Sequence, residues 1–244
     1  MQRLCHETAY KRGWEQLTEI WDGVTKAIQL LISLDPEVLQ IAGRSLRISG
    51  SACLLASLIC VPLGSAIHFH HFPGKRVLIN IIQTLFSVPT VLVGLFVLLL
   101  FSRAGPLGSF GILFTPPVMA IGQMLLIIPL LLGLTISALS GVSKELVDTA
   151  SSLGASGFQT TGVVLREARY AVLAAVILGF ARAISEVGCA LMVGGNIRGA
   201  TRVITTTMSL EASKGELALA IALGIILLFL ALIINIVLNR LQQR

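Results

Sequence analysis

Long apolar runs separated by short polar segments dominate this chain and predict helices that cross a membrane. A transmembrane helix needs about 20 apolar residues. Five runs are long enough: 46–67, 77–101, 117–139, 171–193 and 217–238. Backbone groups in lipid must be hydrogen-bonded within their own segment, so we expect each run to be an α-helix. The sequence therefore predicts an all-α, polytopic membrane protein with five transmembrane helices.

The N-terminal segment follows a different pattern, with apolar residues at helical spacing and charges mostly on the other face. The apolar residues that repeat at helical spacing between residues 14 and 34 are Leu17, Ile20, Trp21, Val24, Ile28 and Leu31. This stretch carries too many charges to span a bilayer, so we interpret it as an amphipathic helix at the membrane surface. Asp35-Pro36 should end it, because proline disfavours helix in the residue before it. We expect an interfacial segment over residues 1–44 and a transmembrane domain over 45–244.

Composition supports a membrane protein and excludes several other classes. Of 244 residues, 55% are hydrophobic and 12% are charged, whereas soluble domains carry about 25% charged residues. The net charge of +6 comes with no basic run interleaved with aromatics, so we expect no nucleic-acid partner. The four cysteines lack metal-ligand spacing and are interpreted as small buried hydrophobes. His68, His70 and His71 fit an interfacial position better than a metal site.

Motifs for bond chemistry are absent. Gly194 to Thr201 resembles a phosphate loop superficially, but Ala200 stands where such a loop needs lysine. There is no zinc-protease motif and no nucleophile elbow. We therefore expect no enzyme activity, no metal and no cofactor in this chain.

A short polar island, Asp148 to Gly154, lies between two long apolar blocks. On a helix from Lys144 to Leu153, four apolar residues share one face and Gly154 can end the helix with a positive φ. Those four are Leu146, Val147, Ala150 and Leu153. Such an amphipathic helix suits a groove on another protein. It could equally be a solvated loop that packs on the ends of its own spans.

The same segment resembles the cytoplasmic coupling loop of bacterial ABC importer permeases. The family pattern is Glu-Ala-Ala, three residues, then Gly; here it reads Asp148-Thr149-Ala150, three residues, then Gly154. Asp148 and Thr149 depart from it, and Leu165-Arg166 replaces a frequent Leu-Pro. Three other stretches are similar to the oxyanion branch that imports molybdate and tungstate: 87–94, 181–188 and 194–202. Residues 205–207 and 211–215 look most like the tungstate permeases, and the resemblance covers about residues 45–240.

This resemblance implies a type I ABC importer-like permease in the cell (inner) membrane of a prokaryote. It implies a homodimer, two ABC ATPase subunits that bind ATP and Mg, and an external tungstate- or molybdate-binding protein. The ATPases would dock on the coupling loop, residues 143–166. This loop would then be cytoplasmic and the N-terminus outside, although Lys and Arg are not enriched on the inside as usual. We expect the docking contacts from Glu145, Leu146, Asp148, Thr149, Ala150, Leu153, Gly154 and Ala155.

Two sets of residues are candidates for the anion pathway. Arg182 and Glu186 share one face of the fourth span, beside Ser185, and charges inside a membrane helix normally face the bundle interior. They either line a gate or form a neutral pair that fixes helix packing, and the second fits better, since a carboxylate repels an oxyanion. Pro89 and Gly94 interrupt the second span and suit either a constriction or close packing.

Arg198, Thr201 and Arg202 follow the fourth span and are candidates for the outer entrance. They could attract a tetrahedral oxyanion, pair with acidic residues of a docked binding protein, or belong to a solvated loop. Two other functions stay open. One is a permease for sulfate, phosphate or another solute; the other is a self-contained secondary transporter or channel, against which the lack of an internal repeat counts.

Overall fold

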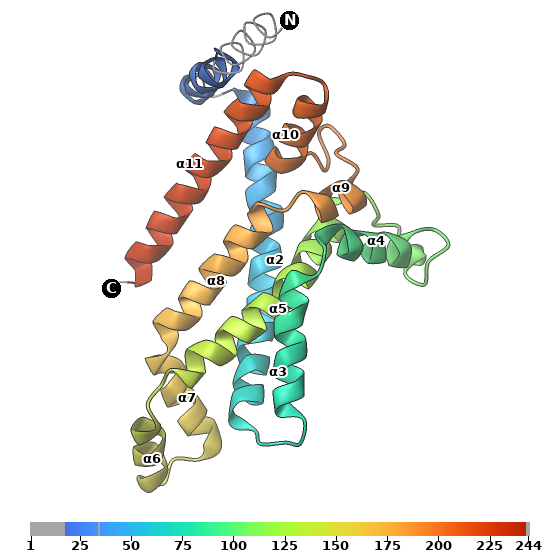
Figure 1. The fold of residues 1–244 in the computed structure, drawn as a ribbon. Coiled ribbons are helices and arrows are strands. Elements are labelled where there is room, and N and C mark those ends of the chain that lie inside the picture. The colour runs from blue at the N-terminus through green and yellow to red at the C-terminus, as the bar shows by residue number, and fades with distance from the viewer. Residues whose placement is uncertain (1–17, 34, 243–244) are drawn as a thin grey trace, which may run out of the picture.

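The computed structural model describes residues 18–33 and 35–242, and these are mostly helical, with no strand among them. Residues 18–32 form a helix. The other helices, labelled in Figure 1, are α2 (Pro36–Phe69), α3 (Lys75–Thr84), α4 (Thr90–Phe101), α5 (Pro116–Ser140), α6 (Lys144–Ser152), α7 (Gly157–Glu167), α8 (Arg169–Ile184), α9 (Gly188–Gly194), α10 (Ile204–Ser213) and α11 (Leu217–Gln242). Two short 3-10 helices, η1 (Leu85–Ser87) and η2 (Gly108–Phe110), flank α4. The predicted all-α class is confirmed.

Helix α2 begins ten residues before the predicted first span. The Asp35 carboxylate accepts hydrogen bonds from the backbone N–H groups of Glu37 and Val38, at 2.9 and 3.1 Å. Pro36 follows at the first helical position, where its fixed φ is favourable. Charged Arg44 lies in the extension, so hydropathy placed the start of the span too late. The predicted division at residues 44 and 45 falls within α2 and stays a prediction.

The predicted N-terminal helix is present over residues 18–32. It ends at residue 32, just before the Asp35-Pro36 pair, and residues 14–17 and 34 of the predicted segment lie outside the described residues. Its Gly23 lies so close to Ile221 of α11 that an added Cβ would meet that side chain at 2.6 Å. Trp21 and Ile32 are exposed. The position of this helix at a membrane surface stays a prediction.

The second and fourth spans are not single helices, which corrects the sequence expectation. Helices α3 and α4 meet at 96°, and α8 and α9 meet at 58°. In the first case Pro89 holds Val88 in an extended conformation, which ends the helix. Within the part of the chain that the structure describes, three continuous helices are long and apolar enough to span a membrane, namely α2, α5 and α11. The total reaches five when each bent pair is one span.

The centre of the fold is α5, which contacts α2, α3, α4, α8 and α9. Its Ile127 and Leu131 are fully buried between α2 and α8. Close approach depends on small residues: Gly179 of α8 faces Leu131 with no room for a Cβ. Cys53 and Cys60 of α2 are buried free thiols, as predicted for small hydrophobes.

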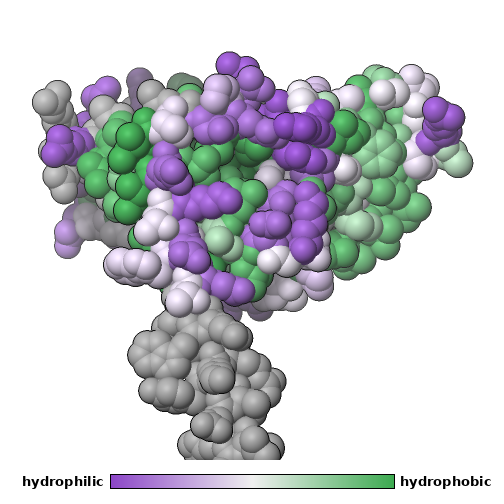
Figure 2. Space-filling view, turned by 90° about the horizontal axis from the view of Figure 1, so that it is seen from above, coloured by the Kyte–Doolittle hydropathy of each residue, from purple (hydrophilic) through white to green (hydrophobic). Residues whose placement is uncertain are grey.

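Two polar regions lie at opposite ends of this bundle. Helices α6 and α7 occupy one end, and α10 with the N-terminal end of α2 occupies the other (Figure 1). Figure 2 shows that hydrophilic residues gather over the centre of the second end, while apolar residues cover its flanks. We call the α6–α7 end the inner end and the α10 end the outer end.

Candidate functional site

Helix α6 forms at the inner end where the sequence predicted a helix. It runs from Lys144 to Ser152, and Gly154 follows with φ of +81°. The N–H of Ala155 donates to the carbonyl of Ala150 at 3.0 Å, which closes the helix end. Glycine adopts this left-handed conformation without strain, so the chain can turn sharply here.

The apolar face of α6 is divided between two environments. Leu146 and Val147 are half-buried and pack against Leu139 of α5 and Val164 of α7. Leu153 instead points away from the chain, with 83% of its surface exposed. The predicted stripe of four residues therefore does not face a partner as a whole, because half of it secures α6 to its own chain.

Phe158 is the residue at this end that sequence reasoning missed. It lies in the first turn of α7 and is 89% exposed. A capping box holds that turn: the backbone N–H of Ser156 donates to Gln159 Oε1 at 2.8 Å, and the Gln159 N–H donates to Ser156 Oγ at 3.4 Å. Leu153 and Phe158 are the two most exposed large apolar side chains of the loop. A lone aromatic in a polar segment was the available signal.

The break between α8 and α9 is organised by the buried Glu186 carboxylate. Its Oε2 accepts from Arg182 Nη1 at 2.9 Å, and its Oε1 accepts from the Cys189 N–H at 2.9 Å. Thr205 Oγ1 donates to the Glu186 carbonyl at 2.8 Å. Glu186 therefore caps α9 while Arg182 neutralises it. The ion pair that the sequence predicted is therefore present, and its role in helix packing stays a prediction.

The breaks in the two bent spans are in contact. A Cβ on Gly94 of α4 would lie 2.9 Å from the Cys189 Cα of α9, and one on Gly188 would lie 2.8 Å from Thr90 Oγ1. Two glycines thus bring α4 and α9 together just beyond their breaks. A role in the anion path for Pro89, Gly94, Arg182, Ser185 and Glu186 stays a prediction.

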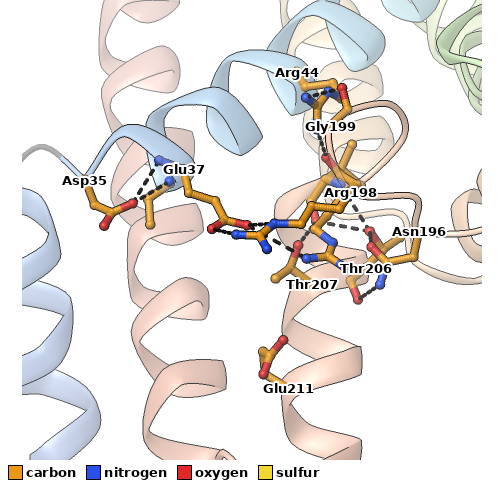
Figure 3. Close-up of polar contacts among 12 residues, drawn as sticks. Asp35, Glu37, Arg44, Asn196, Arg198, Gly199, Thr206, Thr207 and Glu211 are labelled. Atoms are coloured by element: carbon orange, nitrogen blue, oxygen red, sulfur yellow. Dashed lines mark hydrogen bonds and ion pairs between the residues drawn. The ribbon is translucent and has the colours of Figure 1, made fainter.

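An ion pair across the outer end joins segments far apart in the sequence. Arg198 donates through Nε and Nη2 to the two Glu37 oxygens, at 2.9 and 2.6 Å (Figure 3). These hydrogen bonds, and next the negative charge of Glu37, raise the pKa of Arg198 above its ordinary value. Arg202 lies near the same carboxylate, with Nη1 3.9 Å from Glu37 Oε1. The sequence singled out both arginines but not Glu37.

The loop that carries these arginines is fixed to α2 and α10. Arg44 donates to the carbonyls of Arg202 and Gly199, at 2.8 and 2.9 Å. Thr206 Oγ1 donates to Asn196 Oδ1 at 2.9 Å. Thr201 is fully buried and accepts from the Ile197 N–H at 3.0 Å, so it shapes the loop from inside and does not line the surface.

Comparisons with known proteins agree with this architecture. Residues 60–244 match the family model described as the binding-protein-dependent transport system inner membrane component. The chain is 41% identical to the tungstate uptake system permease protein TupB of Peptoclostridium acidaminophilum, over 92% of this chain and 98% of that protein. It is 37% identical to TupB of Campylobacter jejuni, over 93% and 95%.

A solved structure shares the fold. The bacterial alginate ABC transporter, in complex with an alginate pentasaccharide-bound periplasmic protein, superposes with a TM-score of 0.73 at 16% identity. The match covers 95% of this chain and 88% of that one. The resemblance that the coupling-loop motif indicated is thus confirmed, including the type I importer fold. This chain belongs to the family of binding-protein-dependent transport system inner membrane components, the multi-pass permease subunits of ABC transporters.

Proposed function

We propose that this chain is the permease subunit of an ATP-driven importer for tungstate, with molybdate as the related alternative cargo. The observation that carries the proposal is the 41% identity to a tungstate uptake permease over nearly the whole of both chains. Both anions are tetrahedral dianions of similar size, so permease residues alone discriminate weakly between them. The permease itself supplies alternating access, and bond chemistry belongs to its partner.

The inner end supports docking of a separate ATPase subunit on α6 and α7. Leu153 and Phe158 expose apolar surface there, next to the exposed polar face of α6 that carries Asp148. Burial of exposed apolar side chains is the main source of affinity at protein interfaces. We infer two ATPase subunits, one on each copy of a homodimer, and these subunits bind ATP and Mg.

Contacts within the chain suggest how a movement at the inner end would reach the anion path. Leu146 of α6 packs in the same cluster as Val172 of α8. Helix α8 leads to the break at Glu186, and α9 beyond it packs against α4. Closure of the ATPases would therefore shift the inner end of α8 and act on the bent spans, which turns the pathway outward.

The hydrophilic outer end supports docking of an external binding protein (Figure 2). Such a protein would deliver the anion to the face that carries Arg198 and Arg202. A permease for sulfate, phosphate or another solute would keep this arrangement and change only the binding protein. A secondary transporter would need neither the ATPase nor the binding protein, so the dependence of uptake on these partners distinguishes the two functions.

The first experiment is co-purification of the permease with its ATPase candidate, in the wild type and in Phe158→Ala. Phe110→Ala is the matched control, because Phe110 is 67% exposed on the α4–α5 connection. We expect Phe158→Ala to lose the ATPase, Phe110→Ala to keep it, and all three chains to unfold at the same temperature. Equal recovery of the ATPase with all three would place the docking surface elsewhere.

Uptake measurements then test the function itself. Vesicles that contain the wild-type permease, the ATPase and the binding protein should accumulate tungstate only with ATP. Ala150→Asp, which places a charge on α6, should abolish this uptake. Full uptake without any ATPase subunit would exclude the importer and favour the secondary transporter. ATP-driven uptake of sulfate but not of tungstate would keep the permease and replace the cargo.

A further inference from the structure

We propose that Arg198 and Arg202 form a receiving site for a tetrahedral oxyanion at the outer end, and that the Glu37 carboxylate occupies this site until the anion displaces it. This inference rests on the proposed function, since the anion is the imported tungstate. It adds a defined binding site on the permease chain and a residue that controls its occupancy.

The ion pair of Glu37 and Arg198 has the geometry that an oxyanion would take. The Arg198 fork donates two parallel hydrogen bonds to two oxygens of one anionic group. A planar guanidinium binds carboxylates and tetrahedral oxyanions through this same arrangement. Glu37 therefore holds a place that a dianion with more oxygens and more charge can fill.

Release of Glu37 is easy at this position. Its side chain is 47% exposed, and that of Arg198 is 73% exposed. Ion pairs at such exposed positions contribute little stability, because water solvates both separated charges well. The Glu37 side chain can rotate into solvent while α2 stays in place, since Asp35 caps that helix independently.

The contacts of Arg202 indicate that Glu37 leaves part of the hydrogen-bonding capacity of the two arginines unused. Its side chain is only 18% exposed, yet its nearest Glu37 oxygen is 3.9 Å away, beyond hydrogen-bond distance. Arg202 Nε is buried and has no hydrogen-bond partner among the described residues. Buried N–H groups are normally paired. A tetrahedral anion presents acceptors in several directions, so one anion between the two arginines can receive hydrogen bonds from both.

Space and charge around the three residues favour an anion. Two open cavities of about 320 and 360 Å³ meet there, and Glu37, Arg198 and Arg202 line both. The remaining carboxylates of the cavities are already engaged: Asp35 caps α2, and Glu211 accepts from Lys214 at 2.9 Å. Among the described residues, Glu37 is the carboxylate within ion-pair distance of Arg198 and Arg202, so both arginines lose their acidic partner once Glu37 leaves.

The test measures tungstate binding by the permease–ATPase complex in lipid nanodiscs, without the binding protein. Equilibrium dialysis followed by elemental analysis of tungsten gives the Kd. Glu37→Gln removes the competing charge, and Arg202→Gln removes a donor. Arg103→Gln, on the α4–α5 connection, removes one positive charge outside both cavities and is the control. Thermal unfolding of each complex shows whether it is folded.

We expect Glu37→Gln to bind tungstate about tenfold more tightly than the wild type, and Arg202→Gln at least about tenfold more weakly, from the loss of charge-assisted hydrogen bonds. Arg103→Gln should match the wild type. If Arg202→Gln does not fold, the exposed Arg198→Gln takes its place with the same expectation. If the residues had only a structural role, the unfolding temperatures of the variants would change, but the Kd for tungstate would be the same in all of them.

Three results would overturn the proposal. The first is no binding by the wild type and by Glu37→Gln, and the second is binding that Arg202→Gln leaves unchanged. The third is a loss of binding-protein association in Arg202→Gln while the complex alone binds no tungstate; the arginines would then receive a carboxylate of that protein. ATP-driven uptake by the wild type separates these failures from failure of the proposed function, because uptake persists if only the receiving site is wrong.

Discussion

Replacement of Gly94 by alanine tests the contact between α4 and α9. The new methyl group would lie 2.9 Å from the Cys189 Cα and 3.0 Å from the Met192 Cβ, well inside the usual contact distance. The first neighbour is backbone, so no side-chain rotation relieves the clash and the helices must separate. Overpacking of this kind costs about 1–3 kcal/mol. The helical preference of alanine over glycine offsets about 0.5–1 kcal/mol of that cost.

We therefore expect Gly94→Ala to lower the free energy of unfolding by about 1–2 kcal/mol. The measurement is thermal unfolding of the purified chain in detergent, together with ATP-driven tungstate uptake at 25 °C. Gly43→Ala in α2 is the matched control, because a Cβ there meets nothing within 4 Å. It should be as stable as the wild type or slightly more stable. Equal stability of the two variants would refute the close approach of α4 and α9.

Three further predictions concern the buried pair and the inner loop. Arg182→Ala should lower the free energy of unfolding by about 2–3 kcal/mol, which is less than for a fully buried pair because the Arg182 side chain is 39% exposed. Arg198→Ala should lower it by less, and equal unfolding temperatures of the two variants in detergent would contradict this prediction. Glu186→Gln should retain the hydrogen bond to α9 but lose the charge pair, so it should be more stable than Glu186→Ala in the same assay. Gly154→Ala should cost about 1–2 kcal/mol because alanine disfavours the positive φ, and it should slow ATP-driven uptake. Gly50→Ala in α2, where a Cβ meets nothing within 4 Å, is the control and should not slow uptake.

The sequence predicted those features that depend on local pattern. Helix α6 has nearly the predicted bounds, and α5 differs from the predicted span by one residue at each end. In both cases turn-forming or polar residues mark the ends of the helix. The positive φ of Gly154 was also expected, because an amphipathic run ends there.

The sequence did not predict the bends, because hydropathy reports which residues are apolar and not whether the helix axis changes direction. Val77 to Phe101 contains no charged residue on either side of its 96° turn, so a search for long uncharged runs predicts a single span. Pro89 predicts an interruption of the span, but the size of the bend depends on what α4 packs against. The i, i+4 spacing predicts the pair of Glu186 with Arg182, but the bond of Glu186 to the Cys189 N–H depends on the break between α8 and α9, which no local pattern specifies.

The ion pair at the outer end could not be predicted from the sequence. Glu37 and Arg198 are 161 positions apart, and their meeting depends on the early start of α2 and on the loop that Arg44 fastens. Phe158 was not predicted because it lies outside the Asp148 to Gly154 motif. Only the fold shows that Leu146 and Val147 pack inward while Phe158 is exposed.

The contact between the two bent spans makes their bends interdependent. If α8 and α9 straightened alone, α9 would leave Gly94 and open a void beside α4; if α3 and α4 straightened alone, Gly188 would lose its neighbour Thr90. Voids in a close-packed interior are costly. Intermediates with one straight and one bent span should therefore be rare, and the pair should behave as a single cooperative unit with two conformations. Permeases of this kind would then switch in one step, and mutations at Pro89 and Glu186 would show non-additive effects on the same equilibrium.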